Sequence, residues 1–262
     1  MAKGGGGMSL TLAFLGDFGE AVEFIFKERE SVSGGVQIGG LAEIGEFTIT
    51  HLQVSVVAMA FACAVSIPIG LYLGHFGKGE FFAITVSNVG RAVPSVVLLV
   101  FFLAYLGIGF TNVAAVLFLL AVPPILTNTY VGTRQIDPEV VDAARGVGMS
   151  DLQVVRRVRL PLAMPTIFAG IRFSAVSVVA TATIAPLANV QTLGEPLVTP
   201  SVYGFEGQLG AAIVVTILTL LIDAGLGGIQ RAATPRGIKL AGETPARRRW
   251  LTLPTRRREA AT

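Results

Sequence analysis

The sequence predicts an all-α integral membrane protein with five spanning helices, an extracytoplasmic N-terminus and a cytoplasmic C-terminus. Hydrophobic residues make up 52% of the 262 residues and charged residues only 14%, whereas soluble domains carry about 25% charged residues. The apolar residues lie in runs long enough to cross a bilayer, which takes about 20 residues of helix. Lys and Arg are concentrated in alternate connections between these runs. A chain of this composition can bury its apolar surface only in lipid.

The N-terminal segment, residues 1–47, is acidic and contains one predicted amphipathic helix. Such a helix can lie on a membrane surface or pack against a bundle. We expect packing, because an acidic face gains nothing from anionic lipid. Helical spacing defines the two faces. The apolar face comprises Phe14, Phe18, Ala21, Val22 and Ile25. The acidic face opposite comprises Asp17, Glu20 and Glu23.

Five apolar runs follow within the transmembrane domain, residues 48–230. The second run is too long for one simple span, because Arg91 and Pro94 interrupt it. We interpret residues 81–90 as a lead-in helix and residues 93–106 with their flanks as the span. The five runs are residues 52–73, 81–106, 113–127, 167–187 and 209–229.

The distribution of basic residues predicts the orientation of these spans. If the polar loop 132–165 is cytoplasmic, the connection 74–80 and the tail 231–262 lie on the same side, which then holds fifteen of the twenty Lys and Arg residues. Cytoplasmic loops carry such an excess. The tail contains the Arg triplets 247–249 and 256–258. We expect them to contact anionic lipid rather than nucleic acid, since a single tryptophan is the only aromatic residue beside them.

The loop 132–165 is the longest charged segment between apolar runs, and it predicts two short helices joined by a glycine turn. Asp137 is a typical N-cap for the first helix, and Pro138 suits the first helical position. Gly146 and Gly148 can each provide the left-handed residue that ends it. The residues expected to share its apolar face are Val140, Ala143, Ala144 and Val147.

The second helix of the loop is predicted to begin at Ser150. Gln153, three residues on, completes the spacing of a capping box. Leu152 and Val155 would lie on one side, and Pro161 is expected to close the helix. A helical hairpin with a small apolar face suits a groove on another protein; the alternative is a solvated connection between two spans.

This loop resembles the EAA loop of ABC importer permeases, in which Glu-Ala-Ala is followed at fixed spacing by a glycine and a hydrophobic-x-Leu-Pro ending. The chain departs from the pattern in having aspartate at the glutamate position. The resemblance implies a cytoplasmic loop that docks on a separate ATPase, and the five-helix fold of type I importers similar to methionine permeases. The residues involved are Asp142, Ala143, Ala144, Gly148, Met149, Ser150, Val158, Leu160 and Pro161.

The resemblance also implies partners and a location. The chain would lie in the plasma membrane of a prokaryote, paired with a second permease chain or a copy of itself. Two ATPase subunits and an extracytoplasmic solute-binding protein would complete the importer. ATP and Mg²⁺ would be bound by the ATPase, with no cofactor on this chain.

Two further stretches resemble the permeases for osmoprotectants such as glycine betaine, choline and carnitine. These are residues 90–102, GRAVPSVVLLVFF, and residues 221–238, LIDAGLGGIQRAATPRGI. The first is shared with importers of methionine and other amino acids, so an amino-acid importer is the alternative.

A membrane-embedded enzyme or a scaffold protein is the alternative of a different class. One cysteine and two distant histidines, His51 and His75, provide no catalytic triad and no metal site. The charged residues expected inside spans are Arg91, Arg172 and Asp223, an inventory too small for most hydrolytic chemistry. We therefore predict no catalytic residues.

Small and hydroxylated residues form a stripe on the fourth span. Such stripes allow helices to approach closely, although a solute path would also use them; we favour packing. They are Gly170, Ser174, Ser177 and Thr181.

Asp223 needs a partner or a protonated state in a membrane. Arg172 is expected at about the same depth, so we prefer an Arg172–Asp223 ion pair. Arg91, near Pro94, is the second candidate partner. In a third possibility Arg172 extends to the head groups and no ion pair forms.

Overall fold

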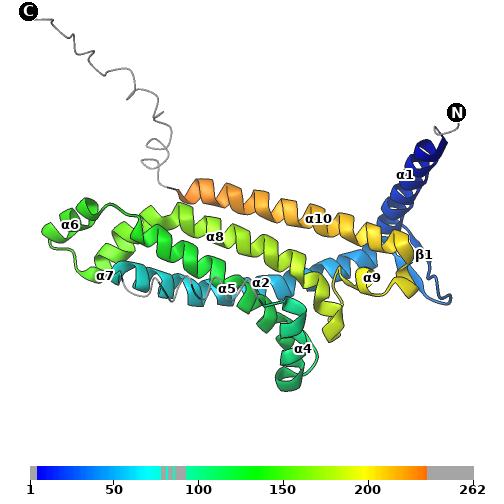
Figure 1. Cartoon of the computed structure of the whole chain (residues 1–262), viewed down its shortest axis with the longest axis horizontal. Coiled ribbons are helices and arrows are strands. Elements are labelled where there is room, and N and C mark those ends of the chain that lie inside the picture. Colours follow the sequence, from blue (N-terminus) through cyan, green and yellow to red (C-terminus); the bar gives the residue numbers. More distant parts are fainter. Residues whose placement is uncertain (1–4, 78–80, 82–84, 86–92, 235–262) are drawn as a thin grey trace, which may run out of the picture.

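A computed structural model of the chain describes residues 5–77, 81, 85 and 93–234. Most of them are helical, and four long helices lie side by side in a bundle (Figure 1). A polar helical loop lies at one end of the bundle, and a small β-hairpin lies at the other. We call these the loop end and the hairpin end. The long helices are α2 (Gly40–Phe76), α5 (Phe110–Arg134), α8 (Leu160–Thr181) and α10 (Pro200–Ala233).

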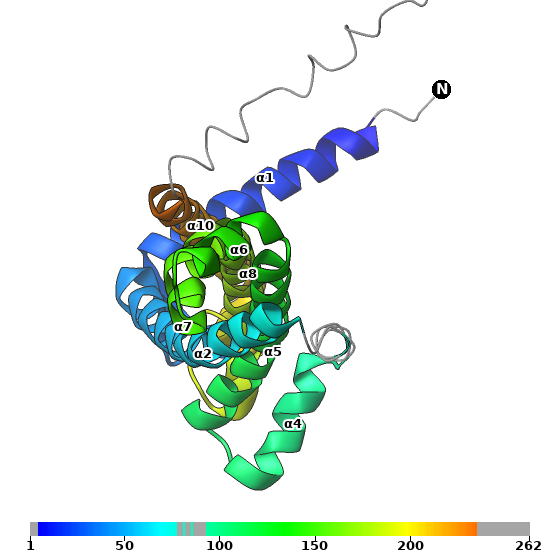
Figure 2. The same cartoon turned by 90° about the vertical axis from the view of Figure 1, so that its left-hand side faces the viewer.

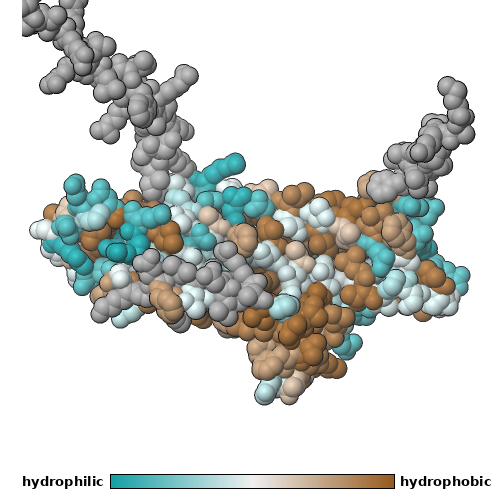
Figure 3. All heavy atoms as spheres, in the orientation of Figure 1, coloured by the Kyte–Doolittle hydropathy of each residue, from teal (hydrophilic) through white to brown (hydrophobic). Residues whose placement is uncertain are grey.

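The predicted all-α membrane fold is confirmed. Within the described residues, four helical stretches are long and apolar enough to cross a membrane: Gly40–Phe76, Phe110–Arg134, Asp151–Ala188 and Pro200–Ala233. They contain the first, third, fourth and fifth predicted spans. In the space-filling view, hydrophobic residues cover much of the bundle, and hydrophilic residues gather at its two ends (Figure 3).

The second predicted span corresponds to α4 (Ser95–Leu106), which has 12 residues and is about 18 Å long. It projects from the side of the bundle (Figures 1 and 2). Pro94 precedes it in an extended conformation and serves as its N-cap. Arg91 and most of the expected lead-in helix, 81–90, lie outside the described residues. Five spans and the orientation of the chain therefore stay predictions.

The long helices extend beyond the predicted spans. α2 begins at Gly40, so residue 47, the expected end of the N-terminal segment, falls inside this helix. α5 continues through Pro123 and Pro124 to Arg134. Prolines are tolerated in such helices because neighbouring polar side chains bond the disturbed backbone. Here the Ser174 hydroxyl of the neighbouring helix α8 donates to the carbonyl of Ala121, three residues before Pro124, at 3.0 Å.

Pro161 does not close a helix, contrary to the sequence prediction. α7 (Asp151–Val154) passes without a break into a five-residue π-helix, η1 (Val155–Arg159), and then into α8. The amide of Leu160 donates to the carbonyl of Val155, five residues back. This wider turn accommodates Pro161, which lacks an amide hydrogen and would clash with a carbonyl in a regular helix.

The N-terminal helix α1 (Gly5–Phe26) packs against α10, as expected, but its buried face only partly matches the predicted one. Ala21 and Phe24 are buried, whereas Phe18 is exposed. Phe18 is exposed because only the last turns of α1 contact α10, and the rest of α1 projects away from the bundle (Figure 2). At the crossing, Gly207 and Gly210 leave room for the Phe24 ring.

The β-hairpin that follows α1 was not predicted. Strands β1 (Glu28–Glu30) and β2 (Gln37–Gly39) pair antiparallel, with Arg29 opposite Ile38. The Arg29 guanidinium donates to the carbonyl of Tyr203 and to the carboxylate of Glu206, each at 3.0 Å. These bonds attach the hairpin to the beginning of α10.

The connection between α8 and α10 is also structured. A 3₁₀ helix, η2 (Ala182–Ala188), follows α8, and the short helix α9 (Glu195–Val198) precedes α10. α10 bends at Gly204, whose φ is 67°. The predicted fifth span, 209–229, is the straight part of α10 beyond this bend.

The largest apolar core lies among α2, α5 and the end of α8, and it includes Val54, Leu117, Ile125 and Val178. Towards the loop end, α5 and α2 lie so close together that glycines of α2 occupy the points of contact. A Cβ atom added to Gly70 would lie 2.6 Å from Cβ of Thr129, and one added to Gly74 would lie 2.6 Å from Cβ of Thr133. The same holds between α5 and α8, where an added Cβ on Gly170 would lie 2.7 Å from Cβ of Asn128.

This packing predicts that Gly70→Leu destabilises the folded protein, because the new side chain has to push α2 away from α5. Overpacking of a tight contact costs about 1–3 kcal/mol. Gly225→Leu is the control, since a Cβ at exposed Gly225 in α10 meets nothing within 4 Å. We expect the thermal midpoint in detergent to fall for Gly70→Leu and to stay near wild type for Gly225→Leu. Equal midpoints would contradict the packing described.

Candidate functional site

The polar loop at the loop end begins with α6 (Pro138–Gly146), and its capping follows the sequence prediction. The Asp137 carboxylate accepts a bond from the amide of Glu139 at 2.9 Å. Of the two glycines considered for the end of this helix, Gly146 is still helical and Gly148 has the left-handed conformation, with φ of 87°. The amide of Gly148 donates to the carbonyl of Arg145 at 2.9 Å. Gly148 therefore makes the turn between the loop helices.

The predicted capping box at the start of α7 is present. The Ser150 hydroxyl accepts from the amide of Gln153 at 3.4 Å, and the Gln153 side chain accepts from the amide of Ser150 at 2.9 Å. These two bonds satisfy amides that a helix start leaves without partners.

A small apolar core holds the two loop helices together. Val141 and Ala144 from α6 are buried against Val154 from α7. This differs from the expected face, because Ala144 is inside while Val140, Ala143 and Val147 are exposed. The turn at Gly148 folds α7 back over the edge of α6 that carries Val141, so packing rather than the apolar pattern selects the buried side.

The exposed apolar residues of the loop form a surface of their own. Val147 is 77% exposed and Leu152 is 66% exposed, with Val140 also exposed. Asp142 is exposed as well, and its carboxylate makes no hydrogen bond within the described part of the chain. We call Val140, Asp142, Ala143, Val147 and Leu152 the loop surface.

The other residues of the motif build the loop. Met149 and Val158 pack against the small core, and Leu160 packs on a second core formed by Leu71, Ala163 and Ile167. Ser150 is the cap, Gly148 the turn, and Pro161 begins α8. The motif thus divides into residues that shape the loop and residues left exposed on it.

Two polar ties connect the loop to the membrane helices, and the sequence did not indicate either. One oxygen of the Asp151 carboxylate accepts from Arg145 at 2.9 Å and contacts Nε2 of His75 at 3.3 Å. Arg159, buried in η1, donates to the carbonyl of Thr133 at the end of α5, at 2.8 Å. The capping pattern places Asp151 at a helix start, but no signal links it to a histidine 76 positions away.

Further along the bundle, the half-exposed side chains of Arg172 and Asp223 form the predicted ion pair. Two nitrogens of the guanidinium donate to the two carboxylate oxygens, at 2.9 and 2.8 Å. Gln230 extends the network: its side-chain oxygen accepts from Arg172 at 3.1 Å, and its amide donates to the carbonyl of Pro165 at 2.9 Å. Gly227 has no side chain to obstruct the guanidinium. The network fastens α8 to α10 along the half nearer the loop end.

Two residues of the predicted small-residue stripe pack between helices. Gly170 lies against α5, and the Ser174 hydroxyl donates to the carbonyl of Ala121 at 3.0 Å. The Ser177 hydroxyl bonds within α8, to the carbonyl of Phe173, and Thr181 is half-buried at the end of α8. A solute path along the stripe, or beside Pro94, stays a prediction.

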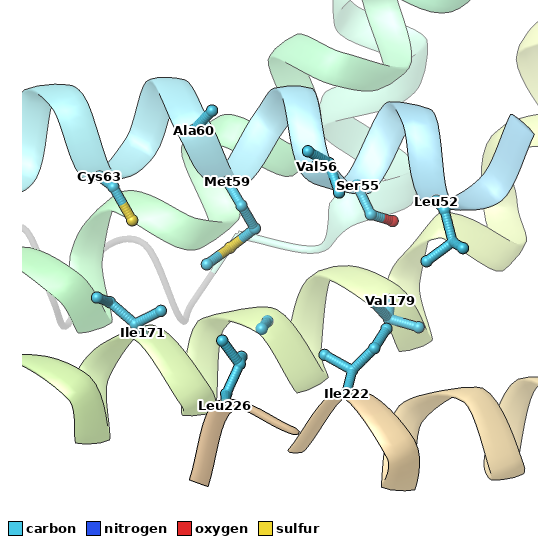
Figure 4. Close-up of a pocket in the computed structure, with 11 residues that line it drawn as sticks. Leu52, Ser55, Val56, Met59, Ala60, Cys63, Ile171, Val179, Ile222 and Leu226 are labelled. Atoms are coloured by element: carbon cyan, nitrogen blue, oxygen red, sulfur yellow. The ribbon is translucent and has the colours of Figure 1, made fainter. Parts of the chain in front are cut away.

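A cavity of about 350 Å³ lies between α2, α8 and α10 (Figure 4). Its lining is apolar except for Ser55, which is itself bonded to the carbonyl of His51 at 2.7 Å. Met59, Cys63 and Ile222 are among the residues that point into it (Figure 4). Such a lining offers no group that would recognise a polar solute.

The chain is thus a bundle of membrane-length helices with a capped helical loop at one end. Residues 66–238 match the family described as binding-protein-dependent transport system inner membrane component. The chain belongs to this family. It is therefore a multi-pass plasma-membrane permease, not an enzyme, and permeases of this family work with an ATPase and a solute-binding protein.

Several curated relatives are similar over most of their length. The carnitine transport permease protein OpuCB of Listeria monocytogenes is 37% identical, over 75% of this chain and 90% of the relative. The choline transport system permease protein OpuBB of Bacillus subtilis is 35% identical, over 73% and 89%. The osmoprotectant import permease protein OsmY of Salmonella typhimurium is 32% identical, over 72% and 81%.

Two solved structures show the same fold at lower identity. One is the MetNI methionine ABC transporter in an inward facing conformation, with a TM-score of 0.64 and 21% identity, covering 74% of this chain and 98% of the other. The second is an amino acid ABC transporter with histidines, with a TM-score of 0.59 and 19% identity, covering 73% and 94%. The expected importer-permease fold is confirmed.

The Arg172–Asp223 pair predicts that Asp223→Asn lowers the thermal midpoint of the protein in detergent, because the guanidinium loses its charged partner. Exchanging the two residues, Arg172→Asp with Asp223→Arg, should recover part of the loss. Asp17→Asn in the projecting part of α1 is the control for removal of one carboxylate. If Asp223→Asn and Asp17→Asn had the same midpoint, the pair would have no structural role.

Proposed function

We propose that this chain is the permease subunit of an ABC importer for osmoprotectants of the glycine betaine, choline and carnitine class. The observation that carries the solute class is the 29–37% identity to permeases named for these solutes. The amino-acid importers that are the alternative resemble the chain at about 20% identity, which supports a shared fold and no particular solute.

The loop of α6 and α7 is proposed as the part that docks on the ATPase. The loop surface presents exposed apolar side chains, Val147 and Leu152 above all, beside the unbonded carboxylate of Asp142. Exposed apolar residues in a polar loop are typical of a surface that a partner covers. The capped helices and the small core beneath them hold this surface in one conformation without the partner.

The assembly is proposed to contain two ATPase subunits, a solute-binding protein and a second permease, either another chain or a copy of this one. ATP and Mg²⁺ would be bound by the ATPase, and this chain would hold no cofactor. The solute-binding protein would recognise the solute, since aromatic cages hold quaternary ammonium groups. The proposed contact of the basic tail with anionic lipid concerns residues that lie mostly outside the described part of the chain.

The turn at Gly148 predicts that Gly148→Val impairs transport. A β-branched residue in the left-handed conformation costs about 1–3 kcal/mol, so the loop would lose the shape needed for docking. Gly148→Asn should retain more activity, because asparagine adopts this conformation more readily. Gly146→Val is the control, since added Cβ atoms at both glycines meet open space but Gly146 is helical. Wild-type uptake by Gly148→Val would contradict the docking proposal.

The proposed solute class predicts the phenotype of a deletion. Cells that lack this chain should lose energy-dependent uptake of radiolabelled glycine betaine, choline or carnitine at high osmolarity, and the gene on a plasmid should restore it. Methionine and histidine uptake serve as controls and should not change. Unchanged uptake of all three osmoprotectants together with lost amino-acid uptake would assign the chain to the alternative.

A further inference from the structure

We propose that Asp151 is the positioning residue that passes movement of the loop to transmembrane helix α2. The proposal rests on the function proposed above, in which the ATPase moves the loop. It assigns a role to three residues that the motif does not include: Arg145 on α6, Asp151 on α7 and His75 on the last turn of α2.

One atom joins the three helices. Oδ1 of Asp151 accepts a bond from Nη2 of Arg145 at 2.9 Å and contacts Nε2 of His75 at 3.3 Å. Because a carboxylate oxygen accepts, Nε2 of His75 has to carry the hydrogen. The same oxygen therefore fixes the angle between α6 and α7 and links both to α2.

The two sides of this link differ in their freedom to move. The His75 side chain is only 1% exposed, and its ring meets the Phe76 ring edge-on at a centroid distance of 4.8 Å. Asp151 and Arg145 are 59% and 49% exposed. The buried imidazole is thus the fixed point on α2, and the two exposed side chains move with the loop.

Nε2 carries the hydrogen bond that this ring makes. Nδ1 of His75 is buried and has no hydrogen-bond partner among the described residues. Burial of a polar group without a partner is costly, so separation of Asp151 from His75 would leave the whole ring unsatisfied. This cost keeps the loop and α2 together when either one moves.

Apolar packing between α2 and α7 is incomplete beside the link. A cavity of about 420 Å³ lies there, lined by Tyr72 and Phe76 of α2 and by Leu152 and Val155 on the other side. The second polar tie, from Arg159 to the carbonyl of Thr133, starts from η1 and ends on α5. Val155 also packs on the core that contains Leu71 of α2. Among the described residues, the Asp151 carboxylate is the polar contact that joins α6 to α2.

Substitutions of His75 can separate hydrogen bonding from packing. The amide nitrogen of glutamine reaches the position of Nε2, whereas that of asparagine reaches only the position of Nδ1. His75→Gln should therefore keep the link, while His75→Asn and His75→Leu should break it. Arg145→Met is a further variant, which leaves His75 bound but frees α6 from Asp151.

The experiment uses the importer purified with its ATPase subunits and reconstituted in proteoliposomes with the solute-binding protein. ATP hydrolysis is measured with and without solute-loaded binding protein, and uptake is measured in parallel. We expect His75→Leu, His75→Asn and Arg145→Met to reduce solute-stimulated hydrolysis and uptake at least about fivefold, the lower range of allosteric coupling. Hydrolysis without binding protein should stay at the wild-type rate, and His75→Gln should retain most of the stimulation.

A distance measurement tests the link directly, even if a variant loses activity because it folds poorly. Spin labels at Glu139 on α6 and at Ile69 on α2, both exposed, are introduced after Cys63, the single cysteine, is replaced by serine. In the wild type the distance distribution should stay narrow when ATP is added. It should broaden or shift in His75→Leu and not in His75→Gln.

Equal loss of stimulation in His75→Gln and His75→Leu would overturn the proposal, because packing alone would then explain the role of the histidine. Wild-type stimulation in His75→Leu, or an unchanged distance distribution in that variant, would overturn it too. Failure of the proposed solute class would appear differently, as an absence of uptake and of solute-stimulated hydrolysis in the wild-type importer itself.

Discussion

Helices in lipid gain little free energy from burying apolar surface against one another, because lipid tails are equally apolar. They associate instead where their backbones can approach closely. In this permease that approach is made by α5, which meets Gly70 and Gly74 of α2 through Thr129 and Thr133. On its other side it receives Gly170 of α8. The α5 helix is thus held between two neighbours at a spacing that no larger side chain would allow. The polar ties at the loop end, including the bond from Arg159 to the end of α5, depend on this fixed spacing.

The continuous helix from Asp151 to Thr181 makes the loop an extension of the bundle rather than a flexible connection. Three attachments brace it: Asp151 against α2, Arg159 against α5, and Arg172 with Gln230 against α10. Each attachment contains a charged group, and each reaches a different helix. A displacement at the docking surface would therefore reach all three neighbours of α8 together.

Local chemistry in the sequence predicted the features that neighbouring residues determine. The caps at Asp137 and Ser150, the turn at Gly148 and the four long spans all follow from short-range patterns, and the Arg172–Asp223 pair followed from depth along two helices. The sequence could not predict contacts that depend on where distant elements cross. The bond between His75 and Asp151, the burial of Phe24 in place of Phe18, and the β-hairpin on α10 belong to this group. The prediction that Pro161 closes the second loop helix was wrong, because a proline ends a regular helix but a π-helix accommodates it.

The π-helix Val155–Arg159 has a geometric consequence for the loop as a whole. In a regular helix each residue turns the chain by about 100°, so the one extra residue in a π turn rotates everything before it relative to everything after it. The direction in which the side chains of α7 point is thus set by the number of residues in the π turn, and not by any particular side chain. Removing one residue from this turn would leave every loop side chain in place on its own helix and yet point Asp151 away from α2.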